Sequence, residues 1–292
     1  MPMIKLGEFN TLTIDRRLEQ GFYLIDETQD SVLLPNRYIT DEMQIGDLVD
    51  VFVYNDSEDR IVATTLEPMI TLNKFADLKV VSVSDHGAFL DWGLAKDLFV
   101  PFREQATGMK EGQSYIVYLY LDTETDRLAA SSKIDKYVRS DKPPFQEKEE
   151  VDILITYRSD IGVNVIINDQ YKGVLYENEI FQEVQPGQRM KGFIKKIRED
   201  NKIDVGLQRS GYENVLPNEQ KILAKLKEAN GFLALGDKSS PEEIIAALGM
   251  SKKVFKKAIG SLFKQRVIRI EEKGISLATK KTFRANKDPR GD

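Results

Sequence analysis

The sequence predicts a mostly β protein, with three tandem five-stranded barrels followed by a C-terminal α+β domain of three helices and a β-hairpin. Three observations lead to this fold class. A set of landmark residues recurs three times, the segments around the landmarks alternate apolar and polar residues, and the period becomes helical near Pro217. A chain of 292 residues has room for about two to four such domains.

Each repeat contains a glycine that opens an apolar stretch, a proline or tyrosine that ends a strand, and a second glycine. The landmarks are separated by 14 and then 11 positions in all three repeats, a regularity that chance does not explain. They are Gly21, Pro35 and Gly46, then Gly87, Pro101 and Gly112, then Gly162, Tyr176 and Gly187.

The repeats have the length and the residue pattern of small barrels. Each is about 65 residues of short β runs bounded by Gly, Asp and Asn turns. This is typical of a five-stranded barrel of the OB type, in which closure removes exposed strand edges. We expect barrels over residues 1–70, 71–138 and 151–210, and the composition of residues 139–150 predicts a linker before the third.

The last domain, residues 211–292, contains signals of a winged helix. Ser240-Pro241-Glu242-Glu243 is a capping box with proline in the first helical position, and Gly249 ends that helix. A third helix begins after Ser251, so a short glycine-containing turn joins two helices. Two β runs follow, Val267 to Ile270 and Ile275 to Leu277, and these form the expected hairpin.

The composition argues against an enzyme and against a membrane protein. The chain has no cysteine and one histidine, which excludes thiol chemistry, disulfides and sites built from several histidines. It has no Walker loop, and its paired aspartates lie in turns. No apolar run approaches the roughly 20 residues that cross a bilayer, and no signal-peptide core opens the chain. We expect no catalytic residue, metal or cofactor, and a cytoplasmic location.

Charge divides the chain into two parts. Residues 1–210 carry 25 Lys and Arg against 37 Asp and Glu, a net −12, whereas residues 211–292 carry 17 against 10, a net +7. The first repeat alone, residues 1–70, has 5 basic and 14 acidic residues. The basic end is the natural place for a polyanion, and the first repeat is expected to act as a spacer or a protein contact.

The second repeat resembles the S1 RNA-binding domain. Its segment Val81 to Leu90 contains the strand, turn and strand of that family, with His86-Gly87-Ala88-Phe89 at the turn. The resemblance implies that bases stack on His86 and Phe89, and that Arg127 completes the patch. Asp122 lies one residue further away than the family pattern requires, and Pro101 stands where the family has a third stacking residue.

The other two repeats match the S1 pattern in part. In the third, Tyr176 occupies a stacking position and Lys202 lies near the arginine position. The first has Tyr23, with Asp56 and Arg60 at the family spacing. No repeat contains the whole set, so the resemblance does not imply that all three bind RNA alike.

A basic strand is predicted in the third repeat. Strand alternation places Lys191, Phe193 and Lys195 on one face, and a strand that combines lysines with an aromatic ring is suited to nucleic acid. The alternative is a solvated edge hairpin whose lysines prevent aggregation. The candidate RNA contacts of this repeat are Tyr176, Lys191, Phe193, Lys195, Lys196 and Lys202.

The third helix of the winged helix separates apolar from basic residues. Val254, Phe255, Ala258, Ile259, Leu262 and Phe263 are expected on a buried stripe. The opposite arc has no acid and no Arg, Asn or Gln, so it favours phosphate contacts over the reading of base edges. Its candidate contacts are Lys253, Lys256, Lys257 and Lys264.

Three S1-like repeats and a terminal winged helix resemble the conserved virulence factor B family of bacterial proteins. The resemblance implies a cytoplasmic, non-enzymatic protein that binds single-stranded RNA with low sequence specificity and regulates gene expression after transcription. We expect a monomer that does not bind membranes. Two alternatives stay open: a DNA-binding regulator led by the winged helix, and a scaffold whose acidic barrels bind the ribosome or a nuclease.

Overall fold

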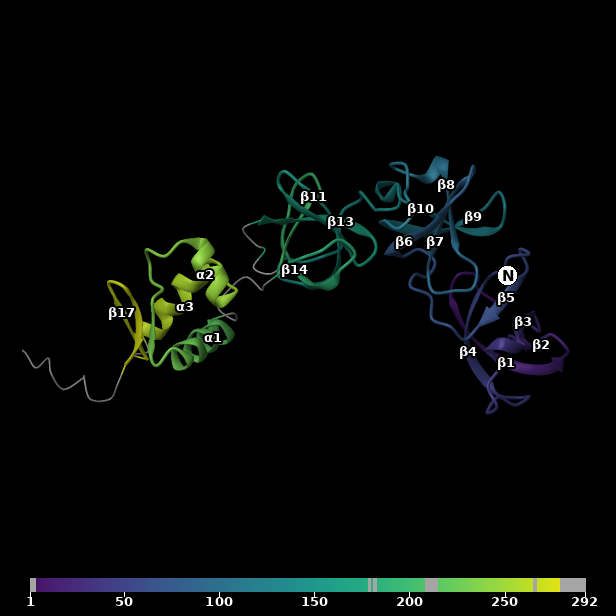
Figure 1. The fold of residues 1–292 in the computed structure, drawn as a ribbon, viewed down its shortest axis with the longest axis horizontal. Coiled ribbons are helices and arrows are strands. Elements are labelled where there is room, and N and C mark those ends of the chain that lie inside the picture. The colour runs from purple at the N-terminus through teal and green to yellow at the C-terminus, as the bar shows by residue number, and fades with distance from the viewer. Residues whose placement is uncertain (1–3, 178–179, 181–182, 208–214, 265–266, 279–292) are drawn as a thin grey trace, which may run out of the picture.

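The computed structural model describes residues 4–177, 180, 183–207, 215–264 and 267–278, and the side chains of residues 215–217 are not described. Its elements follow in chain order as three β units and a small α/β unit, and Figure 1 shows these units following one another along an elongated molecule. The mostly β fold class is confirmed, including the C-terminal winged helix. The predicted boundary at residues 210–211 lies outside the described residues.

The first and third repeats are closed five-stranded barrels with the same strand order. In the first, the order is β1-β2-β3-β5-β4, and a parallel pair of Leu33 and Val62 joins β3 to β5. The third has the order β11-β12-β13-β15-β14. The strands of the first barrel are β1 (Phe9–Leu18), β2 (Gly21–Ile25), β3 (Ser31–Pro35), β4 (Leu48–Asn55) and β5 (Ile61–Thr64). Those of the third are β11 (Glu150–Ser159), β12 (Gly162–Ile167), β13 (Tyr171–Tyr176), β14 (Arg189–Ile197) and β15 (Ile203–Gly206).

The second repeat departs from the expected closed barrel. Its strands form an open sheet of order β10-β9-β6-β7-β8, because β8 and β10 lie side by side without the parallel ladder found in the other repeats. The strands are β6 (Phe75–Val83), β7 (Gly87–Asp91), β8 (Leu98–Pro101), β9 (Ser114–Asp122) and β10 (Arg127–Ser131). Three short 3-10 helices each come after a strand of the first two repeats. They are η1 (Asn36–Tyr38) after β3, η2 (Phe102–Glu104) after β8 and η3 (Ile134–Lys136) after β10.

The landmark spacing has a structural reason. In each repeat the first glycine pairs with the proline or tyrosine across an antiparallel ladder, as Gly87 does with Pro101. A Cβ at Gly87 would lie 2.3 Å from the carbonyl oxygen of Val100, so this close approach of two strands requires glycine. The second glycine donates its N–H to the first strand of the repeat: Gly46 to Ile14, Gly112 to Val80 and Gly187 to Ile155, at 2.8–2.9 Å.

The first two repeats share one hydrophobic core. Trp92, which is 2% exposed, packs edge-on against Phe52 at 5.8 Å and Tyr54 at 6.2 Å, both from the first barrel. Its indole N–H donates to the carbonyl oxygen of Lys96 at 2.6 Å. Trp92 is thus a packing residue, and these two units are fixed together.

The second and third repeats meet at a smaller junction. Phe75 of β6 is buried in one cluster with Leu154 and Ile166 of the third barrel. Asp169 accepts from Arg189 Nη2 at 2.7 Å and lies 3.3 Å from Lys74 Nζ. The segment 139–150, expected to be a linker, lies against the third barrel, since Phe145 packs edge-on against Tyr171.

The winged helix contains the helices α1 (Val215–Glu228), α2 (Pro241–Leu248) and α3 (Lys252–Lys264), with the strands β17 (Ile268–Glu271) and β18 (Gly274–Leu277). Ser240 and Glu243 form both bonds of the predicted capping box, and Gly249 ends α2 with φ 61°. The Ser251 hydroxyl caps α3 by accepting from the N–H of Val254 at 3.2 Å. The short strand β16 (Phe232–Leu233), which the sequence pattern did not indicate, adds a third strand beside β18.

Candidate nucleic-acid interface

The second repeat has an aromatic face on β7 and β8. Phe89 and Phe99 are opposite each other in the ladder, and their ring centroids are 5.1 Å apart. His86, in the turn before β7, is exposed, and the backbone N–H of Phe102 donates to the His86 carbonyl at 3.3 Å. Phe102 is 51% exposed. The predicted Phe89 therefore lies next to one further phenyl ring, that of Phe99, and flat rings of this kind are platforms for bases.

Sequence reasoning missed Phe99 because it considered only Pro101 at the end of this strand. The spacing nevertheless contained the signal. Once Gly87 pairs with Pro101 in antiparallel strands, the residue two positions inward on one strand faces the residue two positions inward on the other. Phe89 must then face Phe99, as it does in the structure.

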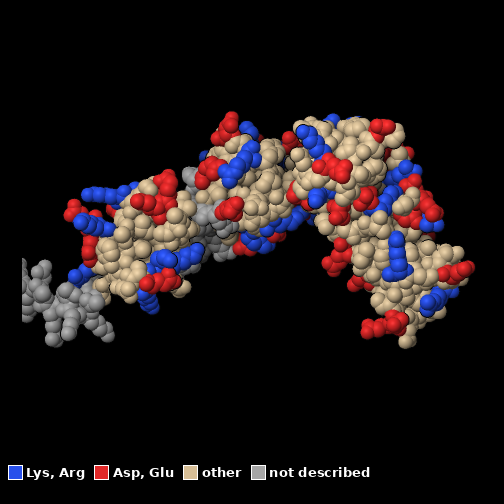
Figure 2. Space-filling view, viewed as in Figure 1, with Lys and Arg blue, Asp and Glu red and all other residues tan. Residues whose placement is uncertain are grey.

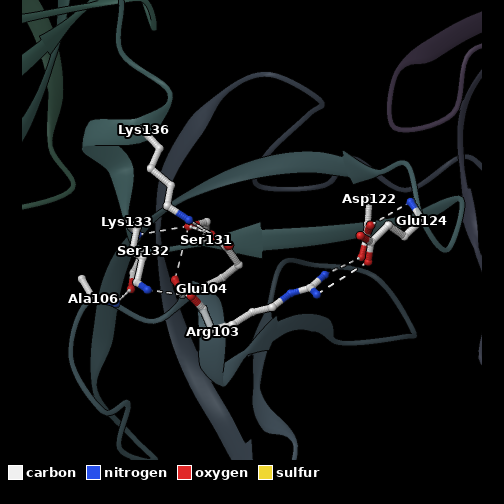
Figure 3. Close-up of polar contacts among 9 residues, drawn as sticks. All are labelled: Arg103, Glu104, Ala106, Asp122, Glu124, Ser131, Ser132, Lys133 and Lys136. Atoms are coloured by element: carbon white, nitrogen blue, oxygen red, sulfur yellow. Dashed lines mark hydrogen bonds and ion pairs between the residues drawn. The ribbon is translucent and has the colours of Figure 1, made fainter.

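A polar network fixes η2 to β10 where the ladder between β8 and β10 is missing (Figure 3). The Glu104 carboxylate accepts from the Ser131 hydroxyl at 2.6 Å and from Lys136 Nζ at 3.0 Å. Lys133 Nζ donates to the Arg103 carbonyl at 2.7 Å. Burial acts to raise the pKa of Glu104, but the bonds from Ser131 and Lys136 outweigh it and hold that pKa below its usual value. The network thus keeps Glu104 ionised and holds the aromatic face in place.

The two arginines near this face have different partners. Arg103 of η2 reaches across to Asp122 at 3.2 Å, the carboxylate that the S1 resemblance indicated (Figure 3). Arg127, the predicted RNA contact, instead forms an ion pair with Asp59 of the first repeat at 2.7 Å. Sequence reasoning missed Arg103 because the family pattern places its arginine at the last strand. The structure pairs Phe89 with Phe99 across the ladder and directs Arg127 toward the neighbouring barrel.

The third repeat places Tyr176 in a charged cluster. The guanidinium of Arg198 lies 5.8 Å from the centre of the Tyr176 ring, and it also donates a hydrogen bond to the tyrosine hydroxyl. Asp204 lies 2.9 Å from Arg198 and raises the pKa of the arginine. A ring next to a fixed guanidinium combines stacking and positive charge. Arg198 was not among the predicted contacts.

Strand β14 has the predicted alternation. Gly192 and Ile194 are buried, whereas Lys191, Phe193 and Lys195 are not. The edge-hairpin alternative is wrong, because β14 is hydrogen-bonded to β11 on one side and to β15 on the other. Lys191 pairs with Asp152 at 2.7 Å and Lys202 with Asp200 at 2.8 Å, while Lys196 is exposed.

The first repeat has one aromatic residue at the corresponding position. The guanidinium of Arg16 lies over the Tyr23 ring, 4.8 Å from its centre. Asp56, which the S1 spacing indicated, is held by Arg60 at 2.6 Å. Burial opposes ionisation of Asp56, but its hydrogen bonds with Arg60 and Glu58 lower its pKa. The residue opposite Tyr23 on β3 is Leu33, so the ring pair of the second repeat has no counterpart at this position.

Helix α3 presents the predicted lysines to solvent. Lys253, Lys256, Lys257 and Lys264 are exposed, while Phe255, Ala258, Ile259 and Leu262 are at most 1% exposed. Lys256 lies 3.8 Å from Asp237, a loose pair at the surface. Lysine and arginine side chains project from this end of the molecule with acidic groups beside them, and basic and acidic groups are also interleaved over the barrels (Figure 2).

Within the described ranges, no group of three or more metal-ligating side chains comes together. The helices there are also too short or too polar to span a membrane.

Family models match most of the described units. The S1 domain model matches residues 6–66 and 74–133, and a model described as a CvfB-like winged helix domain matches residues 220–277. The third barrel shares the strand order of the first. Together the matched S1 and winged-helix domains support nucleic-acid binding.

Relatives are similar over most of their length. Conserved virulence factor B of Staphylococcus saprophyticus is 30% identical over 250 residues, covering 82% of this chain and 83% of that protein. An uncharacterized Bacillus subtilis protein, YitL, is 28% identical over 267 residues, covering 88% and 89%. Among solved structures, a multidomain protein with nucleic acid binding domains from Streptococcus pneumoniae is 25% identical, with a TM-score of 0.40, and the match covers 93% of this chain and 98% of that one.

Proposed function

Because this chain belongs to the conserved virulence factor B family, we propose that it is a non-catalytic protein that binds single-stranded RNA and regulates gene expression after transcription. The second and third repeats supply stacking rings and the winged helix supplies lysines. The first repeat acts as a spacer or protein contact, and the site of action is the cytoplasm.

The observation that carries the proposal is the aromatic face of the second repeat. Phe89 and Phe99 form a paired platform of two rings 5.1 Å apart, next to the exposed His86. Bases in a duplex are already stacked and paired, so a ring platform favours unpaired nucleotides. The rings accept any base, which fits low sequence specificity.

Each RNA-binding unit alone binds weakly, and the affinity of the whole chain rises because the units are joined. The shared core of the first two repeats and the junction with the third hold the barrels in sequence, so binding at one face raises the effective concentration of the next. Cutting the chain at residue 140 would expose Phe75, Leu154 and Ile166, so tests belong in the full chain.

The test is a titration of the full chain with an unstructured RNA of about 20 nucleotides at several salt concentrations. Replacing both Phe89 and Phe99 by Ala is expected to weaken binding at least tenfold, because each stacked base contributes about 1–3 kcal/mol. Phe9→Ala is the matched control, since Phe9 is 48% exposed on the first barrel and is expected to leave affinity unchanged.

The lysines of α3 are tested in the same titration. Replacing Lys253, Lys256 and Lys257 together by Ala is expected to make the slope of log K against log salt shallower by about two, since each phosphate contact with a single strand contributes about 0.7. Unchanged affinity in both sets of variants would contradict the proposal. Tighter binding of duplex DNA would favour a DNA-binding regulator, and RNA affinity independent of salt would favour a protein scaffold.

A further inference from the structure

Helix α3 exposes a phenyl ring that the apolar stripe was expected to bury. Phe263 is 53% exposed, although its neighbour Leu262 is 1% exposed. Its position, seven residues after Lys256 and three after Gly260, places it at the edge of the lysine arc. The arc therefore combines four exposed lysines with one aromatic ring, and residues 252–264 contain no acid.

Gly260 leaves an open gap on the same arc. A Cβ built on Gly260 would meet no atom within 4 Å, so nothing in the described structure requires the side chain to be absent. Glycine inside a helix is less stable than alanine by about 0.5–1 kcal/mol. The fold alone would thus favour alanine here, and the missing side chain points to a partner that approaches the helix backbone closely.

We propose that an unpaired base of bound RNA rests over Gly260 and stacks on Phe263, while neighbouring lysines contact the phosphates. This inference rests on the proposed function, and it means that α3 of the winged helix contacts an unpaired base of single-stranded RNA. A gap without a side chain beside a flat ring accommodates a base, and the lysine arc complements the charge of the backbone on either side of it.

The arc is poorly suited to a duplex. Helices that read base edges in a groove use Arg, Asn or Gln, and residues 252–264 contain none of these. An exposed phenyl ring gains little from bases that are already stacked in a duplex. A protein ligand would need apolar surface around the ring, whereas the neighbouring Lys264 and the arc lysines are charged.

The test uses Gly260→Ala and Phe263→Ala in the full chain, with a fluorescent oligouridylate of about 20 nucleotides as the probe. Gly260→Ala is expected to raise the thermal stability of the winged helix and yet lower RNA affinity several-fold, since the new methyl group fills the gap. Phe263→Ala is expected to lower affinity about tenfold, and Phe263→Trp to retain binding.

Two matched controls accompany these variants. Gly108→Ala changes a glycine of the second repeat that is equally open, and Ile245→Ala removes an apolar side chain that is 36% exposed on α2. Both are expected to bind RNA as the unmodified chain does.

The outcomes separate this inference from the proposed function. If the unmodified chain binds RNA and both α3 variants match their controls, the stacking site is wrong while the RNA-binding proposal stands. If the two variants weaken binding of a 20-base-pair duplex as much as that of the single strand, the assignment to unpaired bases is wrong. An unmodified chain that binds no RNA would overturn both.

Discussion

Single residues show how the predicted contacts are distributed. Phe89 lies opposite Phe99, whereas Arg127 forms an ion pair 2.7 Å from Asp59 in the first repeat. Asp59 also pairs with Lys96 at 3.0 Å. One carboxylate thus neutralises two cations at the boundary between two repeats, and only a tertiary contact determines this pairing.

We therefore expect Asp59→Asn to raise RNA affinity about two- to threefold. The change removes one negative charge and releases Arg127, and asparagine tolerates the φ of 62° at this turn. Asp126→Asn is the control, because Asp126 occupies a similar turn with φ 55° and also carries one negative charge. Equal affinities of the two variants would show that Arg127 makes no RNA contact even when released.

At the scale of elements, the second repeat lacks the parallel strand pair that closes the other two barrels. Side chains join η2 to β10 there, together with a backbone bond from the N–H of Ser132 to the carbonyl of Glu104 at 3.0 Å. The first and third barrels close through parallel pairs such as Leu33 with Val62, whereas Glu104 and Ser131 connect η2 to β10 in the second. The sequence pattern predicts the strands of each repeat. It does not indicate whether two short parallel strands meet in register, because that depends on the shape of the whole sheet.

Removing this connection is expected to destabilise the second repeat. Glu104→Ala removes the carboxylate that accepts from Ser131 and Lys136, so the free energy of unfolding is expected to fall by about 1–3 kcal/mol. Chemical denaturation measures the change. Glu124→Gln is the control, since Glu124 is 76% exposed and lies 3.7 Å from Arg103.

The same carboxylate predicts a dependence on pH. Because the folded protein holds the pKa of Glu104 below its ordinary value, the stabilisation is present above that ordinary value and is lost as the pH falls through the lowered pKa. Denaturation of Glu104→Gln is expected to show a weaker decline over this acidic range. A decline as steep as that of the unmodified chain would assign the acid sensitivity to other groups.

At the scale of the whole molecule, the junction around Asp169 sets how the second and third repeats face one another. Asp169 accepts from Arg189 at 2.7 Å and lies 3.3 Å from Lys74, while Arg189 also donates to the carbonyl of Phe75 at 2.5 Å. Asp169 is 12% exposed, whereas Arg189 and Lys74 are 48% and 50% exposed, so a mostly buried carboxylate depends on two cations that solvent still reaches.

Weakening this junction is expected to lower the affinity for long RNAs and to leave the affinity for short RNAs unchanged. Asp169→Asn removes the charge that holds Arg189 and Lys74, and affinity for an RNA of about 24 nucleotides is expected to fall about three- to tenfold. An RNA of about six nucleotides occupies one face and is expected to bind unchanged. Asp135→Asn is the control, because its pair with Lys172 also crosses the junction but Asp135 is 68% exposed. An equal loss for both lengths would contradict joint binding by linked faces.

The sequence by itself determined the three β repeats, the winged helix and the exposure of the α3 lysines. Each of these follows from local signals: the spacing of glycine landmarks, strand alternation, the capping box at Ser240 and a helical stripe. Tertiary structure alone decided the open second sheet, the partner of Arg127, the pairing of Tyr176 with Arg198 and the outward position of Phe263. The physical reason is that spacing fixes which residues of a strand or helix share a face, whereas ion pairs and sheet closure depend on distances between segments remote in the chain.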